Sequence, residues 1–167
     1  VDKGVTVGIV TNSLAANDVA AVYGAYRPYR DQLLRGDVHV YELRAQGHPH
    51  SSLFGSSGAS LHTKAYSVDD ARGFIGSFNL DARSAYLNTE MGVMFDDPLL
   101  AKAVRDEYLR LSGPELSYWM HLDKNGKPRW LDRASKRTTL LSKEPHTGAW
   151  QRFSAHAISW LPLESQL

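Results

Sequence analysis

The chain has 167 residues, enough for one domain with a substantial core. It carries 19 Lys and Arg against 18 Asp and Glu, so its net charge of +1 predicts no strong attraction to nucleic acid. The absence of Cys excludes disulfides and thiolate metal sites, and no apolar run approaches the ~20 residues that a membrane-spanning helix needs.

The first expected element is a buried strand followed by a polar cluster. Residues 5–10 are β-branched and almost continuously apolar, which predicts a strand buried on both faces, as in a parallel sheet. Asn12 and Ser13 follow at its end, where α/β folds place ligands. They are candidates for substrate binding, and the alternative is that they only shape the turn.

A helix and a second strand complete a β-α-β unit. Apolar residues at three- and four-residue steps predict a helix from an N-cap at Asp18 to about Gly36. Pro28 lies inside this helix and predicts a kink or a break. Residues 38–43 then predict a strand parallel to the first, joined to it by a right-handed crossover.

A long Gly- and Ser-rich connection, residues 44–60, leads to the next strand. Loops of this length are usually functional or lack fixed structure. His48 and His50 suggest a metal pair, but neither has a carboxylate or a Cys nearby in the sequence. We therefore expect a substrate-side loop here, with no metal and no other cofactor.

The most specific pattern of the chain is H-x-K-x4-D-x6-G-S-x-N. It is formed by His62, Lys64, Asp69, Gly76, Ser77 and Asn79, and chance would produce it in roughly one in 10⁶ chains of this length. Residues 61–68 and 73–77 predict two strands joined by a turn, and His62 and Lys64 share one strand face because alternate side chains point the same way.

The residue types of this pattern suit phosphoryl chemistry. The imidazole of His62 can attack phosphorus, and the ammonium of Lys64 can hold phosphoryl oxygens. Gly76 lets the backbone approach a ligand, while Ser77 and Asn79 can donate hydrogen bonds to it. A further strand, expected at residues 89–95, places Glu90 on the same sheet.

The second half of the chain contains a helix, a hairpin and an aromatic tail. Asp97 and Pro98 predict the start of the helix, and the side chains expected to face the core are Leu99, Leu100, Ala103, Val104, Tyr108, Leu109 and Leu111. Asn125-Gly126 predicts a hairpin between residues 117–122 and 129–131.

Residues 133–143 are expected to be an irregular surface segment, or a basic one drawn to anionic lipid. The tail, residues 150–167, is suited either to a bilayer interface or to packing on the domain or a partner.

The motif resembles the HKD motif of the phospholipase D superfamily. Residues 74–92 are similar to the bacterial cardiolipin synthase branch, as is the T-N-S triplet that contains Asn12, and the last five residues resemble the C-terminus of its third type. The resemblance implies an α/β/α sandwich with a mixed, largely parallel central sheet that forms one half of a two-HKD assembly. It also implies that His62 is the nucleophile, that Lys64, Asn79 and Ser77 hold the phosphate, and that Glu90 orients the imidazole. Asp69 belongs to the motif in either a catalytic or a structural role.

The function implied by the resemblance is phosphatidyl transfer for cardiolipin synthesis, on phospholipid substrates at the cytoplasmic side of the bacterial inner membrane, as a peripheral protein. The chain has one HKD motif where the family uses two. We therefore expect residues 1–167 to be a single HKD domain from the C-terminal part of a longer enzyme. The second motif would come from the same polypeptide or from a second copy. The alternatives are a homodimeric phosphodiesterase or nuclease, and a non-catalytic membrane-docking or assembly domain.

Overall fold

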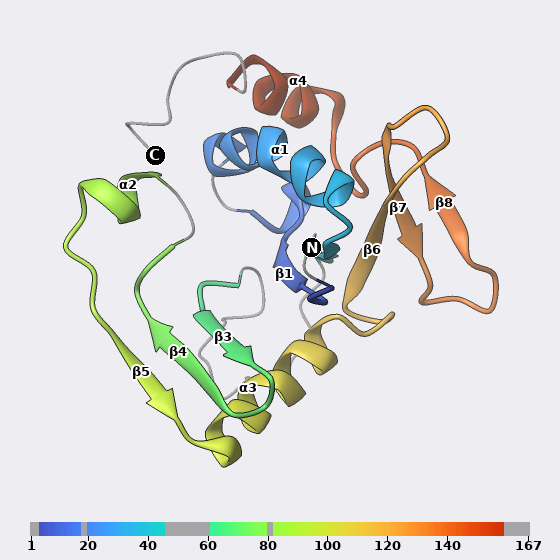
Figure 1. The fold of residues 1–167 in the computed structure, drawn as a ribbon. Coiled ribbons are helices and arrows are strands. Elements are labelled where there is room, and N and C mark those ends of the chain that lie inside the picture. Colours follow the sequence, from blue (N-terminus) through green and yellow to red (C-terminus); the bar gives the residue numbers. More distant parts are fainter. Residues whose placement is uncertain (1–3, 18–19, 46–60, 80–81, 159–167) are drawn as a thin grey trace.

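A computed structural model describes residues 4–17, 20–45, 61–79 and 82–158 (Figure 1). Its strands form two sheets, one with the order β1-β2-β6-β7-β8 and one with the order β3-β4-β5. The α/β class and the mixed sheet are confirmed, although among the described strands only β1 and β2 pair in parallel. Helices α1 and α4 lie together on one side of the larger sheet, and α3 packs on the smaller sheet (Figure 1).

The larger sheet is built from the two ends of the described chain. Its strands are β1 (Gly8–Asn12), β2 (His39–Leu43), β6 (Ser117–Leu122), β7 (Pro128–Asp132) and β8 (Thr139–Leu141). Val40, Tyr118, Met120 and Trp130 form the buried cluster on the face toward α1. The first strand starts later than predicted, and Val5, which is 57% exposed, precedes it. The reason is that β1 is an edge strand, paired on one side only within its sheet.

Helix α1 (Ala20–Arg35) confirms the predicted helix, whose expected N-cap, Asp18, lies outside the described residues. Of the kink or break expected at Pro28, the break is wrong, because the helix continues through this residue. Proline removes one backbone donor and crowds the preceding turn. Here Tyr23 and Arg30 are both buried, one on each side of the proline, so tertiary packing holds the helix together across it.

The smaller sheet carries the motif. It consists of β3 (Lys64–Val68), β4 (Arg72–Gly76) and β5 (Gly92–Asp96), which are antiparallel throughout. Asp69 and Asp70, both with positive φ (52° and 53°), form the tight turn between β3 and β4. Such a turn suits the twist of a two-stranded hairpin, and aspartate tolerates this conformation better than most residues.

Helix α3 (Pro98–Leu111) begins as predicted, because Asp97 Oδ1 accepts hydrogen bonds from the backbone N–H groups of Leu99 (2.8 Å) and Leu100 (3.1 Å). Its predicted core face is too wide. Ala101 and Val104 are buried, whereas Leu99 is 83% exposed. The main partner of α3 is a narrow sheet of three strands, which covers only a thin stripe of the helix, while Tyr108 contacts Tyr41 of the larger sheet.

The C-terminal part confirms the hairpin and corrects the segment after it. Asp123 Oδ1 accepts hydrogen bonds from the backbone N–H groups of Asn125 and Lys127, and Gly126 adopts a φ of 70°. The segment 133–143, expected to be irregular, contains β8. This strand forms by pairing with β7, and the local sequence pattern did not predict it.

Helix α4 (Ala149–Ile158) packs on α1, with Ala155 buried against Leu14 and Tyr23. The remaining elements are a short turn of helix at Leu14–Ala16 and α2 (Ala82–Tyr86). None of the helices in the described ranges is both long enough and apolar enough to cross a membrane.

Candidate functional site

A depression of about 500 Å³ lies at one end of the smaller sheet. It is lined by His62, Lys64, Gly76, Ser77, Asn79, Met91, Gly92 and Val93. The strand register explains this grouping, since the Cα of Lys64 pairs with that of Gly76, which pairs with that of Gly92. Three strand ends therefore meet at one level, and the polar residues that follow or precede them converge there.

His62 and Lys64 enter the depression from the start of β3. The imidazole of His62 is exposed, as a nucleophile must be to reach a substrate. Lys64 Nζ donates a hydrogen bond of 2.7 Å to the carbonyl oxygen of His62. The ammonium group is thereby held next to the backbone that carries the imidazole. A phosphate bound at this position would meet a nucleophile and a fixed positive charge together.

Ser77 also lines the depression, and its hydroxyl group is hydrogen-bonded to Glu90. Ser77 Oγ lies 2.6 Å from Glu90 Oε2, and it accepts a hydrogen bond of 3.0 Å from the backbone N–H of Met91. Asn88 Nδ2 donates to Glu90 Oε1 at 3.2 Å. The hydrogen bond from Ser77 is the main cause that lowers the pKa of Glu90 below its ordinary value, helped by a hydrogen bond from Ser84 and by the charge of Lys64. Glu90 is therefore a carboxylate at neutral pH.

The position of Glu90 differs from the expectation that it lies on a strand, because β5 starts two residues later at Gly92. The backbone N–H of Ser77 donates to Met91 O at 2.8 Å, so the two segments remain joined beyond the regular ladder. Glu90 is held there by side chains rather than by strand pairing. The bond from an imidazole N–H to Glu90 stays a prediction.

Gly76 is confined by its neighbours within the sheet. A Cβ atom at this position would lie 2.5 Å from Met91 O, 2.5 Å from Phe74 Cζ and 2.7 Å from Gly92 Cα. Real Cβ atoms do not come so close, so the glycine is required by the packing of the Phe74 ring and of the neighbouring strand. Gly92, which sequence reasoning did not single out, is confined by the same ring.

The structure does not bring Asp69 to the other motif residues. Asp69 follows the end of β3, so five residues at ~3.3 Å each, roughly 16 Å of strand, separate it from Lys64. Its neighbour Asp70 forms an ion pair of 3.0 Å with Arg105 on α3. Asp69 lies in the hairpin turn, and its contribution to the structure is the positive φ that the turn requires.

Asn12 and Ser13 lie at the end of β1. Ser13 is buried and its Oγ accepts a hydrogen bond of 3.3 Å from Ala16 N, which caps the short helical turn. Asn12 Nδ2 donates to Leu61 O at 2.9 Å, and Asn12 Oδ1 accepts from Leu61 N at 2.8 Å. The side chain of Asn12 therefore contacts the residue that precedes His62. Sequence reasoning did not find this contact, because 49 residues separate its partners.

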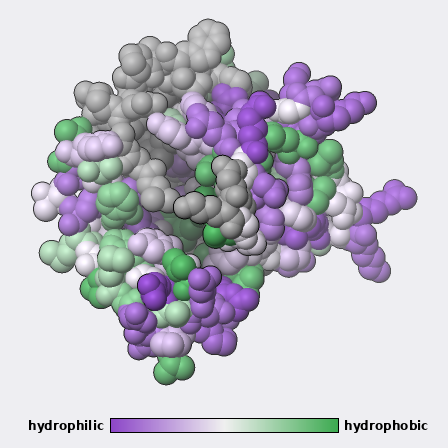
Figure 2. All heavy atoms as spheres, in the orientation of Figure 1, coloured by the Kyte–Doolittle hydropathy of each residue, from purple (hydrophilic) through white to green (hydrophobic). Residues whose placement is uncertain are grey.

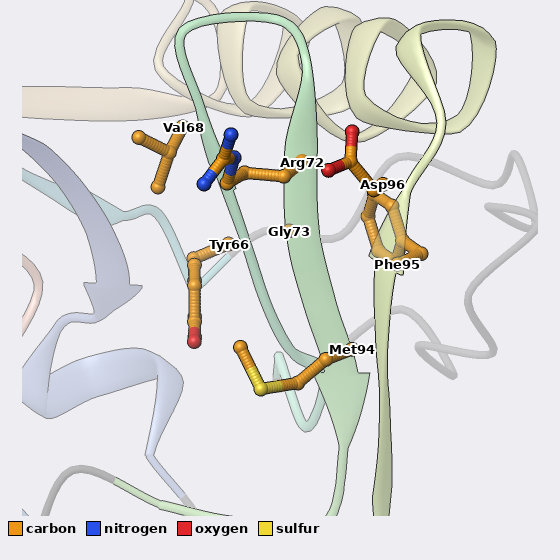
Figure 3. A pocket seen from close by; sticks show the side chains of 7 residues that line it. All are labelled: Tyr66, Val68, Arg72, Gly73, Met94, Phe95 and Asp96. Carbon is orange, nitrogen blue, oxygen red and sulfur yellow. The ribbon is translucent and has the colours of Figure 1, made fainter.

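A second, smaller depression of about 390 Å³ lies toward the hairpin turn, at the other end of the same sheet (Figure 3). Tyr66 and Met94 face one another across it, and Arg72 and Asp96 lie at its rim (Figure 3). The ring of Tyr66 also stacks on that of Phe74, with 5.6 Å between centroids. Tyr66, Val68 and Met94 are exposed at this depression, and polar and apolar side chains are mixed over the lower part of the molecule (Figure 2).

Metal chemistry receives no support from the described side chains. Among residues 4–17, 20–45, 61–79 and 82–158, no three His, Cys, Asp or Glu side chains are grouped to hold a metal ion. His48 and His50, the pair considered from the sequence, lie outside these ranges.

Comparison with known proteins identifies the motif's family. Residues 1–112 match the family model described as "Cardiolipin synthase, PLD-like domain". The chain belongs to this family. The site described above is therefore that of a phospholipase D-like domain, with His62 and Lys64 supplying the histidine and lysine of the HKD motif.

Three relatives of this phospholipase D-like chain illustrate its place in the family, and each of them is longer than it. It is 43% identical to cardiolipin synthase C of Escherichia coli over 98% of the chain and 36% of that protein. It is 46% identical to an uncharacterized protein of Helicobacter pylori (63% of the chain, 21% of that protein). With cardiolipin synthase A of Klebsiella pneumoniae the identity is 32%, over 66% of the chain and 20% of that protein. The chain thus spans about a third or less of these relatives. The search of solved structures gave no match.

Proposed function

We propose that this domain is one half of a phosphatidyltransferase that makes cardiolipin through a phosphohistidine intermediate. The observation that carries the proposal is the convergence of His62, Lys64, Ser77 and Asn79 at one depression, with Glu90 hydrogen-bonded to Ser77. The similarity to cardiolipin synthases C and A supports a glycerophospholipid as the substrate. No cofactor is needed for the reaction.

In the first step, a nitrogen of His62 attacks the phosphorus of a phospholipid phosphodiester, and a P–N bond forms while the P–O bond to the headgroup alcohol breaks. A second imidazole gives its proton to the departing oxygen. In the second step that imidazole takes a proton from the acceptor hydroxyl, whose oxygen attacks phosphorus and releases His62. Lys64 and Asn79 stabilise the negative charge on the phosphoryl oxygens.

The second imidazole is proposed to come from another HKD motif. His62 is the single imidazole that lines the depression in the described part of the chain. The missing group would belong to another part of a longer polypeptide or to a second copy across a two-fold axis. A symmetric pair of single motifs would also suit a homodimeric phosphodiesterase or nuclease. Comparing turnover of labelled phospholipid with cleavage of labelled single-stranded DNA separates the transferase from the nuclease.

Peripheral contact with the cytoplasmic face of the bacterial inner membrane is part of the proposal. Trp150 and Phe153 on α4 are 77% and 62% exposed, and their rings stack with 5.7 Å between centroids. Exposed aromatic side chains of this kind favour the headgroup region of a bilayer. The part of the predicted tail beyond residue 158 lies outside the described residues.

The deciding experiment traps the intermediate in the intact enzyme. Vesicles containing phosphatidylglycerol labelled at phosphorus are mixed with enzyme, and the reaction is stopped with alkali, which preserves phosphohistidine. We expect acid-labile label on the wild-type protein and on the matched control His146→Asn, whose imidazole is also exposed, and none on His62→Asn. Label on the His62→Asn protein, or unchanged turnover by it, would refute the proposal. Cleavage of labelled single-stranded DNA without lipid turnover would favour the nuclease.

A further inference from the structure

The side chain of Asn12 links the larger sheet to the segment that leads into the smaller one. No strand of one sheet pairs with a strand of the other among the described strands. Asn12 is the last residue of β1, and its Cα pairs with that of Leu43 in β2. Its backbone therefore belongs to the larger sheet, while its side chain makes two hydrogen bonds to the backbone of Leu61.

The contact between Asn12 and Leu61 imitates a pair of bonds in a strand ladder. The amide of Asn12 offers an acceptor and a donor on one planar group. It accepts from Leu61 N at 2.8 Å and donates to Leu61 O at 2.9 Å. Two bonds to both polar groups of one residue fix its position and its orientation. A single bond would leave it free to rotate.

Leu61 directly precedes His62, so the position of the Leu61 backbone determines the position from which the His62 side chain extends. Lys64 Nζ in turn binds the carbonyl oxygen of His62 at 2.7 Å, which ties the ammonium group to the same backbone. The larger sheet contains the buried core of Val40, Tyr118, Met120 and Trp130. Asn12 thus connects the segment that leads into β3 to the sheet that contains this buried core.

We propose that Asn12 is a positioning residue, which holds the backbone of Leu61 so that the imidazole of His62 is aligned for attack on phosphorus. This replaces a direct substrate contact as its main role. The inference rests on the proposed function for its kinetic consequence, but the contact itself is independent of that function. Small misplacement of a reacting group can reduce a rate by up to about 100-fold.

The test compares Asn12→Ala with the matched control Asn125→Ala, which alters an exposed amide in the remote β6–β7 turn. The first measurement is hydrogen exchange of the Leu61 backbone amide in the intact enzyme. In Asn12→Ala we expect this amide to exchange about 10-fold faster or more, since its acceptor is gone, while the buried β6 amides of Tyr118 and Met120 keep their protection. Unchanged exchange at Leu61 would overturn the inference.

The second measurement is the kinetics of transfer from phosphatidylglycerol vesicles. A positioning role predicts that Asn12→Ala lowers kcat by about 10- to 100-fold, leaves KM within twofold and does not shift the pH profile. A large rise in KM with unchanged kcat would overturn the inference in favour of substrate binding by Asn12. If His62→Asn proved fully active, the proposed function would fail, whereas the exchange result would still decide the contact.

Asn12→Asp keeps the inference testable if the alanine variant unfolds. It retains an acceptor for Leu61 N but loses the donor, and it places a carboxylate oxygen against Leu61 O. We expect protection of the Leu61 amide to be largely kept while kcat falls about 10-fold. Wild-type kcat in Asn12→Asp would contradict the requirement for both bonds.

Discussion

The buried carboxyl group of Glu42 makes the stability of this domain depend on pH. Glu42 on β2 is fully buried and accepts a hydrogen bond of 2.7 Å from Trp130 Nε1. Tyr23 OH lies 3.3 Å from its Oε1, and Arg30 Nη1 lies 3.9 Å from the same atom. Burial raises the pKa of Glu42 from 4.5 to about 7, although Arg30, Trp130 and Tyr23 each act to lower it.

The sign of the effect follows from this raised pKa. Between pH 4.5 and about 7 the folded protein keeps a proton on Glu42 that the unfolded chain has lost. The stabilising contribution of this group is therefore fully present below pH 4.5 and is lost as the pH rises through about 7. A difference of 7 − 4.5 = 2.5 pKa units, at about 1.36 kcal/mol per unit, corresponds to about 3 kcal/mol.

The assay is urea unfolding of the wild type and Glu42→Gln across pH 4.5 to 8, with Glu115→Gln, an exposed acid, as the matched control. Glutamine cannot ionise, so the wild type should lose about 3 kcal/mol relative to Glu42→Gln over this range. Other titrating groups cancel in the difference. Stability curves of the two proteins that stay parallel, or a wild type that gains relative stability with rising pH, would refute the reasoning.

Two further predictions concern the wall of the site. Gly76→Ala places a methyl group against a backbone carbonyl and an aromatic ring, and overpacking of this kind should lower the free energy of unfolding by about 1–3 kcal/mol. Thermal unfolding tests this against Gly148→Ala, where a Cβ atom meets nothing closer than 3.9 Å; equal losses would contradict the prediction. Ser77→Ala removes the main hydrogen bond that lowers the pKa of Glu90, so that pKa should rise toward 4.5. An NMR titration of the Glu90 carboxyl measures it, with exposed Ser142→Ala as the control, and an unchanged pKa in Ser77→Ala would show that Ser77 is not the cause.

The HKD motif was readable from the sequence because its residues are close together in the chain. His62 and Lys64 are two residues apart, and Gly76, Ser77 and Asn79 follow after one tight turn. A hairpin brings such segments together whatever the rest of the domain does. The same holds for the cap at Asp97 and the Asn125-Gly126 turn, whose hydrogen bonds join residues at most four apart.

The sequence by itself determined the family, the α/β class and the motif residues that line the depression, which are His62, Lys64, Gly76, Ser77 and Asn79. Tertiary structure decided how the motif is supported. The two bonds from Asn12 to Leu61 span 49 residues, and the bond from Trp130 to Glu42 spans 88. Packing also keeps α1 continuous through Pro28. These outcomes depend on which distant surfaces meet, and local patterns of residue type contain no information about that.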